Sequence, residues 1–97
     1  MTYSPGYNSY TRINSQATTV LKVGSGVLHT ITLAAAAVSA AINVYDNPTG
    51  VGTVIFSYTQ GAAALAAPVT FIFDARFNTG LTIITSAANP DMTVTFS

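Results

Sequence analysis

The chain has 97 residues, of which 49% are hydrophobic and 6% are charged, and its formal net charge is zero. Its three basic residues are too few to line a nucleic-acid backbone, so we expect no nucleic-acid partner. The absence of cysteine excludes disulfides and thiolate metal sites. An ordinary soluble domain carries about 25% charged residues. A monomer this poor in charge is prone to associate, so we expect a specific oligomer or a larger assembly.

The chain shows no sign of a membrane partner. The most apolar run, residues 33–45, is rich in alanine and too short to cross a bilayer. The first residues lack the basic start and the apolar run of a secretion signal. We therefore expect neither membrane insertion nor secretion.

The first 16 residues differ from the rest, because they are rich in tyrosine, serine and asparagine and include a Pro-Gly turn signal. We predict an N-terminal arm over residues 1–16 and a single β-sandwich domain over residues 17–97. Two interpretations of the arm remain open, a disordered terminus and a segment that docks on a neighbouring subunit. Tyrosine favours docking, since its ring buries a large area while its hydroxyl keeps a hydrogen bond. The candidate contacts in the arm are Tyr3, Tyr7, Tyr10 and Arg12.

Apolar and polar residues alternate with period two from Thr18 onward, which is the pattern of half-buried strands. In residues 27–33 this alternation places His29 and Ile31 on one face, and Leu28 and Thr30 on the other. Turn residues such as glycine, asparagine and proline separate the runs. The expected strands are 18–23, 27–33, 42–45, 53–58, 69–74, 81–84 and 92–96. Seven or eight short strands predict an all-β fold, an antiparallel β-sandwich or a jelly-roll-like arrangement.

Two alanine-rich pieces interrupt the alternation, at residues 33–41 and 61–68. The first favours a strand or a loop over a short helix, because it runs into the next strand without a helix cap. The second indicates a mobile loop or a single helical turn. Its small side chains suit a close contact with another protein surface, which makes Ala64 and Leu65 further candidate contacts.

The residues available for catalysis are few, and we expect no enzyme. The chain has one histidine and neither cysteine nor glutamate. A Ser–His–Asp set would need His29 as its base. We interpret this mid-strand residue as a core or interface histidine, with pH sensing during assembly as the remaining alternative.

We also expect no metal site and no cofactor. Asp46, Asp74 and Asp91 lie in or near turns without the spacing of a calcium loop, and Asp74 is placed to pair with Arg76. The Gly-Ser-Gly turn lacks the lysine of a phosphate-binding loop. Tyr45, Tyr58 and Phe77 are the only candidates for stacking against a sugar, and packing is the preferred interpretation for them.

The C-terminal run RFNTGLTIITSAANPDMTVTFS resembles the ending of many small structural proteins of tailed bacteriophages. That ending has the form F-x-x-G-L-x-hydrophobic-x-T followed by A-N-x-T-V-x-aromatic. The insertion of Pro90, Asp91 and Met92 departs from it. The resemblance extends over residues 24–97 as a pattern of turns and β-residues and includes no catalytic motif. The matching residues are Phe77, Gly80, Leu81, Ile83, Thr85, Ala88, Asn89, Thr93, Val94 and Phe96.

The resemblance implies a capsid decoration (cement) protein. Such a protein binds the outer capsid surface of the virion as a homotrimer, contacts the major capsid protein and stabilises the capsid. Assembly would take place in the host cytoplasm. Two alternatives remain open: a carbohydrate- or receptor-binding β-module of a phage tail or fibre, and another minor head or tail structural protein.

Overall fold

The computed structural model describes residues 9–36, 39–86 and 90–97, which form eight strands and, within these ranges, no helix. Runs of threonine, valine, isoleucine and phenylalanine account for most of the strands, because these residues fit a pleated, half-buried surface. The strands are β1 (Ser9–Ile13), β2 (Ala17–Val23), β3 (Gly26–Ala35), β4 (Ala41–Asp46), β5 (Thr53–Thr59), β6 (Val69–Phe77), β7 (Gly80–Ser86) and β8 (Asp91–Phe96).

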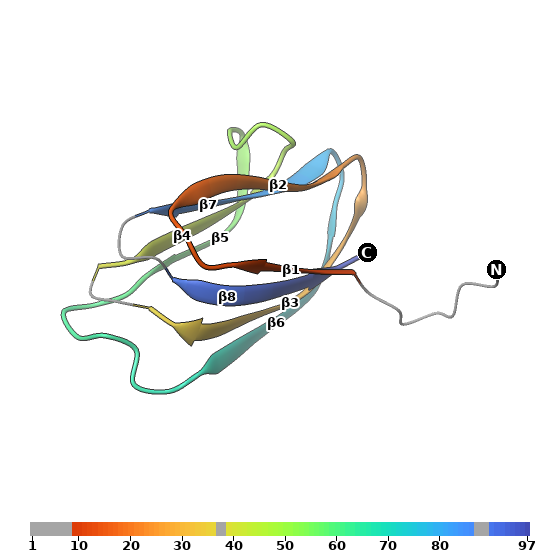
Figure 1. Ribbon diagram of the computed structural model, residues 1–97. Helices are drawn as coiled ribbons and strands as arrows, with labels where there is room; N and C mark the ends of the chain where they lie inside the picture. The colour runs from red at the N-terminus through yellow and green to blue at the C-terminus, as the bar shows by residue number, and fades with distance from the viewer. Residues whose placement is uncertain (1–8, 37–38, 87–89) are drawn as a thin grey trace.

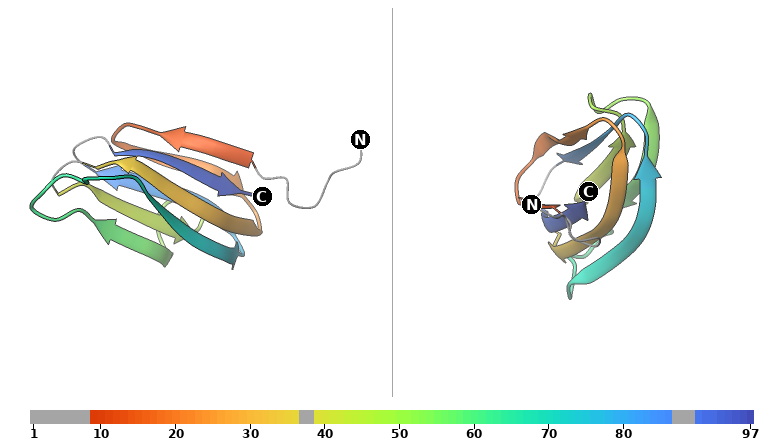
Figure 2. Two further views of the ribbon diagram at one scale, coloured as in Figure 1. Left: turned by 90° about the horizontal axis from the view of Figure 1, so that it is seen from below. Right: turned by 90° about the vertical axis from the view of Figure 1, so that its right-hand side faces the viewer.

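The strands form two antiparallel four-stranded sheets that lie face to face (Figures 1 and 2). Sheet A has the order β1-β8-β3-β6, and sheet B has the order β2-β7-β4-β5. The predicted all-β sandwich is therefore confirmed. Within each sheet, strands far apart in the sequence lie side by side, as β1 and β8 do.

The core lies between the two sheets and is built from alternate residues of the strands. In β8, Met92, Val94 and Phe96 point inward, while in β7 Leu81 and Ile83 do so. Burial of each such side chain stabilises the fold by roughly 1.5–3 kcal/mol. The remaining buried apolar residues are Ile13, Leu28, Ile31, Leu33, Ala36, Ala40, Ile42, Val44 and Phe77.

The predicted facing of residues in β3 is wrong at one point. Leu28 is buried together with Ile31, and His29 is half-buried between them. Leu28 and Thr30 pair with the consecutive residues Phe96 and Thr95 of β8. His29 is thus the extra residue of a β-bulge, which interrupts the alternation of faces.

Part of the predicted N-terminal arm lies within the sandwich. Ser9–Ile13 form β1, which pairs along its length with β8, and Ile13 belongs to the core. Residues 1–8 of the predicted arm lie outside the described residues.

The alanine-rich pieces are strand and loop where the structure describes them. β3 continues to Ala35, and residues 61–68 lie in the β5–β6 loop. Three backbone hydrogen bonds join this loop to the β3–β4 connection, and one of them runs from Leu65 N to Ala36 O at 2.8 Å. The two connections therefore hold each other at one end of the sandwich.

Candidate interaction surfaces

The outer face of sheet A is a regular array of threonines bordered by large apolar side chains. Residues directly opposite each other on antiparallel strands share a face. Tyr10 at one side of the array is 76% exposed, and Ile72 at the other side is 73% exposed. One row contains Tyr10, Thr95, Thr30 and Ile72, and the next contains Arg12, Thr93, Thr32 and Thr70.

Some of the threonine hydroxyl groups in this array form hydrogen bonds between neighbouring strands. The hydroxyl oxygens of Thr30 and Thr95 are 2.6 Å apart, and those of Thr32 and Thr70 are 3.1 Å apart. Thr30 N also donates to the Thr95 hydroxyl at 3.1 Å. These hydrogen bonds fix the orientation of the threonine side chains. The face therefore presents methyl and hydroxyl groups in defined positions.

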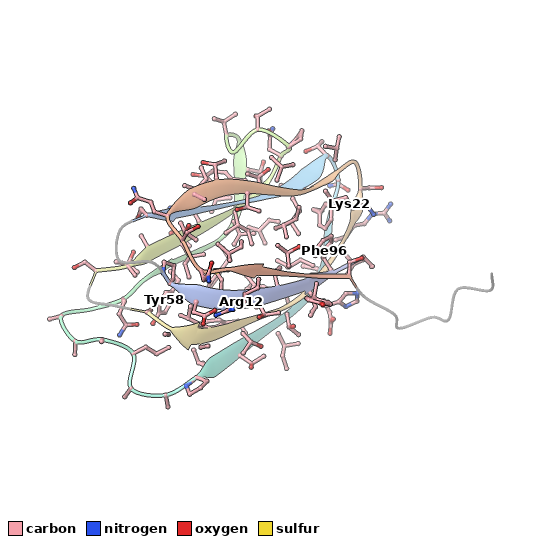
Figure 3. All side chains as sticks on the ribbon, viewed as in Figure 1. Arg12, Lys22, Tyr58 and Phe96 are labelled. Carbon is pink, nitrogen blue, oxygen red and sulfur yellow. The ribbon has the colours of Figure 1, made fainter. Side chains whose placement is uncertain are left out.

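Arg12 lies at the β1 edge of sheet A, where Asp91 holds it by two hydrogen bonds (Figure 3). Its Nε and Nη2 atoms each donate to a different carboxylate oxygen at 2.9 Å. The hydrogen bond to Asp91 raises the pKa of Arg12, and the same bond lowers the pKa of Asp91. The pair fixes the start of β8 against the edge strand β1 and leaves the Arg12 side chain mostly exposed.

His29 joins three segments on the outer side of sheet A. Its Nδ1 lies 2.9 Å from Asp74 Oδ1, and its Nε2 lies 3.3 Å from Ser97 Oγ. Asp74, which the sequence placed beside Arg76, here reaches His29 through a bulge in β6. Asp74 has a φ of 48°, in the left-handed region that few residues other than glycine, asparagine and aspartate adopt.

His29 contacts a serine on one side and an aspartate on the other, as the histidine of a hydrolase triad does. The surroundings of the three residues differ from those of such a triad. The Asp74 side chain is 67% exposed, so water competes for its carboxylate. Ser97 N donates to Val27 O, so this N–H is not free to stabilise an oxyanion. The contacts of His29 with Asp74 and Ser97 connect the end of β8 to β3 and β6.

The outer face of sheet B is made of uncharged residues. Val20 and Val54 stand at the two ends of one row and are 47% and 48% exposed. That row runs Val20, Thr82, Tyr45 and Val54 across all four strands, and the next runs Thr18, Ile84, Asn43 and Ser57. Both rows lack aspartate, glutamate, lysine and arginine.

The two charged residues on the strands of sheet B turn away from this face. Lys22 lies opposite the core residue Leu81, and its ammonium group reaches the end of the sandwich near Gly26 (Figure 3). The Asp46 carboxylate accepts hydrogen bonds from Asn78 N and Thr79 N in the β6–β7 turn, each at 2.9 Å. These backbone bonds lower the pKa of Asp46.

The β4–β5 turn folds back over β7 on the sheet B face. Thr82 donates its hydroxyl to Asn47 O at 2.6 Å, which satisfies a fully buried side chain. A Cβ on Gly50 would lie 3.1 Å from Ile84 Cδ1, and Gly50 also has a φ of 77°. Both observations explain why glycine occupies this position. The turn forms a ridge beside which Val51 is 62% exposed.

Four aromatic rings close the side of the sandwich where β5 and β6 lie. Phe56 packs at 5.0 Å from Phe73 and 5.2 Å from Phe71, and Tyr58 packs at 5.6 Å from Phe71, as measured between ring centroids. The rings pack against the core and remain half-buried. Among the sugar-stacking candidates, Tyr58 belongs to this cluster. Phe77 is fully buried, so it is not available to a sugar.

The predicted contact residues have different environments. Tyr10 and Ala64 are exposed, whereas Leu65 is partly buried against the core. Tyr3 and Tyr7 lie outside the described residues. Within the part of the chain that the structure describes, no helix is long and apolar enough to cross a membrane.

Comparisons of the chain with protein-family models, with curated proteins and with solved structures give no match.

Proposed function

We propose that this chain is a non-enzymatic structural subunit that works by contact with other protein surfaces. The observation that carries the proposal is the pair of outer faces, which expose large apolar side chains in a chain with only six charged residues. Tyr10 and Ile72 mark the sheet A face, and Val20, Val51 and Val54 mark the sheet B side. Exposed apolar groups of this kind are typical of sites of protein association.

We further propose that the sandwich is a jelly roll. The strand pairs β1–β8, β2–β7, β3–β6 and β4–β5 support this topology. They describe one long antiparallel ribbon, the first four strands against the last four, that wraps into two sheets. Jelly rolls of eight strands are common in viral capsid proteins.

Together with the resemblance of residues 24–97 to bacteriophage structural proteins, these features favour a capsid decoration protein. In this proposal a trimer binds the outer surface of the capsid and stabilises contacts between major capsid proteins. The sheet A face, with its fixed threonines, Tyr10 and Ile72, is the surface we assign to the capsid. The modest contacts of the three subunits then act together, so the trimer binds the capsid more tightly than one subunit would.

The test is co-sedimentation of the purified protein with empty capsids of the phage that encodes it. We expect binding by the wild type and loss of binding in the double variant Tyr10→Ser and Ile72→Ser. The molar mass of the variant in solution is the control, and it should equal that of the wild type. Wild-type protein that stays in the supernatant at every concentration would refute the assignment to the capsid.

A further inference from the structure

We propose that the outer face of sheet B is the surface through which copies of this chain contact one another. This inference rests on the proposed function, because it names the surface through which the proposed trimer forms. It assigns sheet A to the capsid and sheet B to the neighbouring subunit.

The distribution of charge between the two sheets is the first argument. Four of the six charged residues, Arg12, Asp74, Arg76 and Asp91, lie on strands of sheet A. The other two, Lys22 and Asp46, are directed to the end of the sandwich and to the β6–β7 turn. The sheet B face is therefore free of charge, as the buried centre of a protein–protein interface commonly is. The uncharged β2 edge of this face matches the uncharged β5 edge, which another copy of the same chain supplies.

The positions of the exposed valines give the second argument. Val20 belongs to β2 and Val54 to β5, which are the two opposite edge strands of sheet B. Val23 extends the first patch, and Val51 lies in the turn three residues before Val54. A patch at one edge of one copy can thus contact the patch at the other edge of the next copy. Contacts of this head-to-tail kind form a closed ring when the rotation between copies closes, and a trimer is such a ring.

The size of the face is the third argument. Four strands at about 4.8 Å spacing, with about seven residues of about 3.4 Å each, give a face of about 19 by 24 Å. Its flat area of about 450 Å² is an upper limit, because the β4–β5 turn covers Thr82 on the central strand β7. The two edge patches that remain are each well below the ~800 Å² that each partner buries in a standard interface. A single contact between two copies would therefore be weak, whereas a closed trimer has three such contacts, each made by one β2 edge and one β5 edge.

The experiment measures the molar mass of the full chain by light scattering on a sizing column, in the absence of capsids. For the wild type we expect about three times the 10.0 kDa chain mass. Val20→Glu and Val54→Glu place a charge on the sheet B face, and each should reduce the mass to that of one chain. Ile72→Glu adds the same charge to sheet A at a more exposed position and should leave the trimer intact. Far-UV circular dichroism checks that all three variants keep their β-structure.

Several outcomes would overturn the inference: a wild type that is monomeric at all concentrations, a trimer that survives both valine variants, or a trimer lost equally in Ile72→Glu. Valine variants that stay trimeric yet no longer bind capsids would assign sheet B to the capsid protein instead. Trimer loss in the valine variants, with no capsid binding by the wild-type trimer, would support the inference while refuting the decoration function.

Discussion

Asp74 of β6 and His29 of β3 meet where both strands carry an extra residue, with 2.9 Å between Asp74 Oδ1 and His29 Nδ1. Leu28 pairs with Ala75 and Thr30 with Ile72, so two residues of β6 lie opposite His29 alone. The bulge turns the Asp74 side chain toward the histidine at the expense of an unusual backbone conformation. A β-bulge commonly serves to redirect a side chain in this way.

The backbone of Asp74 predicts a difference between two small substitutions. Asp74→Ala and Asp74→Gly both remove the contact with His29, but only glycine adopts a φ of 48° freely. We expect Asp74→Ala to be less stable than Asp74→Gly by about 1 kcal/mol. The midpoints of urea unfolding, with equal slopes, measure this difference. An alanine variant as stable as the glycine variant would contradict the strain we assign to this position.

Asp46 predicts a loss of stability in acid. Backbone N–H groups of the β6–β7 turn lower the pKa of its carboxyl in the folded protein. Because the folded pKa is lowered, the stabilisation is complete above the unfolded pKa of about 3.9 and is lost as the pH falls through the folded pKa. The carboxylate is exposed, so we expect Asp46→Ala to reduce the free energy of unfolding at pH 7 by only about 1 kcal/mol.

Unfolding measured between pH 7 and pH 2 checks this prediction. The difference in stability between wild type and Asp46→Ala should shrink below pH 4. A difference that is constant over the whole range would show that the charge of Asp46 has no part in holding the turn.

The close packing around Gly26 predicts that the start of β3 does not tolerate even a methyl side chain at this position. An added Cβ would overlap the backbone atom Ser97 O and would lie 2.6 Å from Cζ of the buried Phe77 ring. We expect Gly26→Ala to lower stability by about 1–3 kcal/mol, since overpacking displaces the neighbours. Gly61→Ala is the matched control, because no heavy atom lies within 4 Å of its added Cβ. Thermal unfolding of both variants should show a lower midpoint for Gly26→Ala alone.

Replacement of the tyrosines assigned to the N-terminal arm should weaken binding to the capsid. We expect the triple variant of Tyr3, Tyr7 and Tyr10 to alanine to bind empty capsids roughly tenfold more weakly or worse, because aromatic anchors commonly dominate an interface. Titration of capsids with labelled protein measures the affinity. Unchanged affinity in the triple variant would exclude the arm from the contact, while the sheet A face would still be open to test.

The alternation of residue types was sufficient to predict most of the strands but not all of their details. Seven expected strands correspond to β2 through β8. β1 was missed because SYTRI is short and polar, and because only Ile13 in it belongs to the core. Its partner β8 lies at the other end of the chain, so local sequence contains no signal for the pairing. The bulge at His29 was missed for the same reason, since pairing with neighbouring strands defines it.

The candidate surfaces were predictable only in part. The scarcity of charge indicated association, and the sequence analysis named Tyr10, which the structure shows to be highly exposed. The uncharged face could not be found without the strand order, because Val20 and Val54 share a row only through β7 and β4. The contact between His29 and Asp74 likewise joins residues far apart in the chain, so the local sequence around either residue does not indicate it.

The strand pairing also sets the order in which the chain can fold. Among the strands that the structure describes, β4 and β5 are the only two that pair with each other and are joined by a short turn. Each successive pair outward encloses a longer segment, up to β1 and β8. Such non-local pairing slows folding to milliseconds or seconds, because the entropy of closing each loop is lost before its contacts form. We expect the β4–β5 hairpin to form early and the two terminal strands to join last. Until they join, β8 presents an open edge, where pairing with another chain competes with the native pairing.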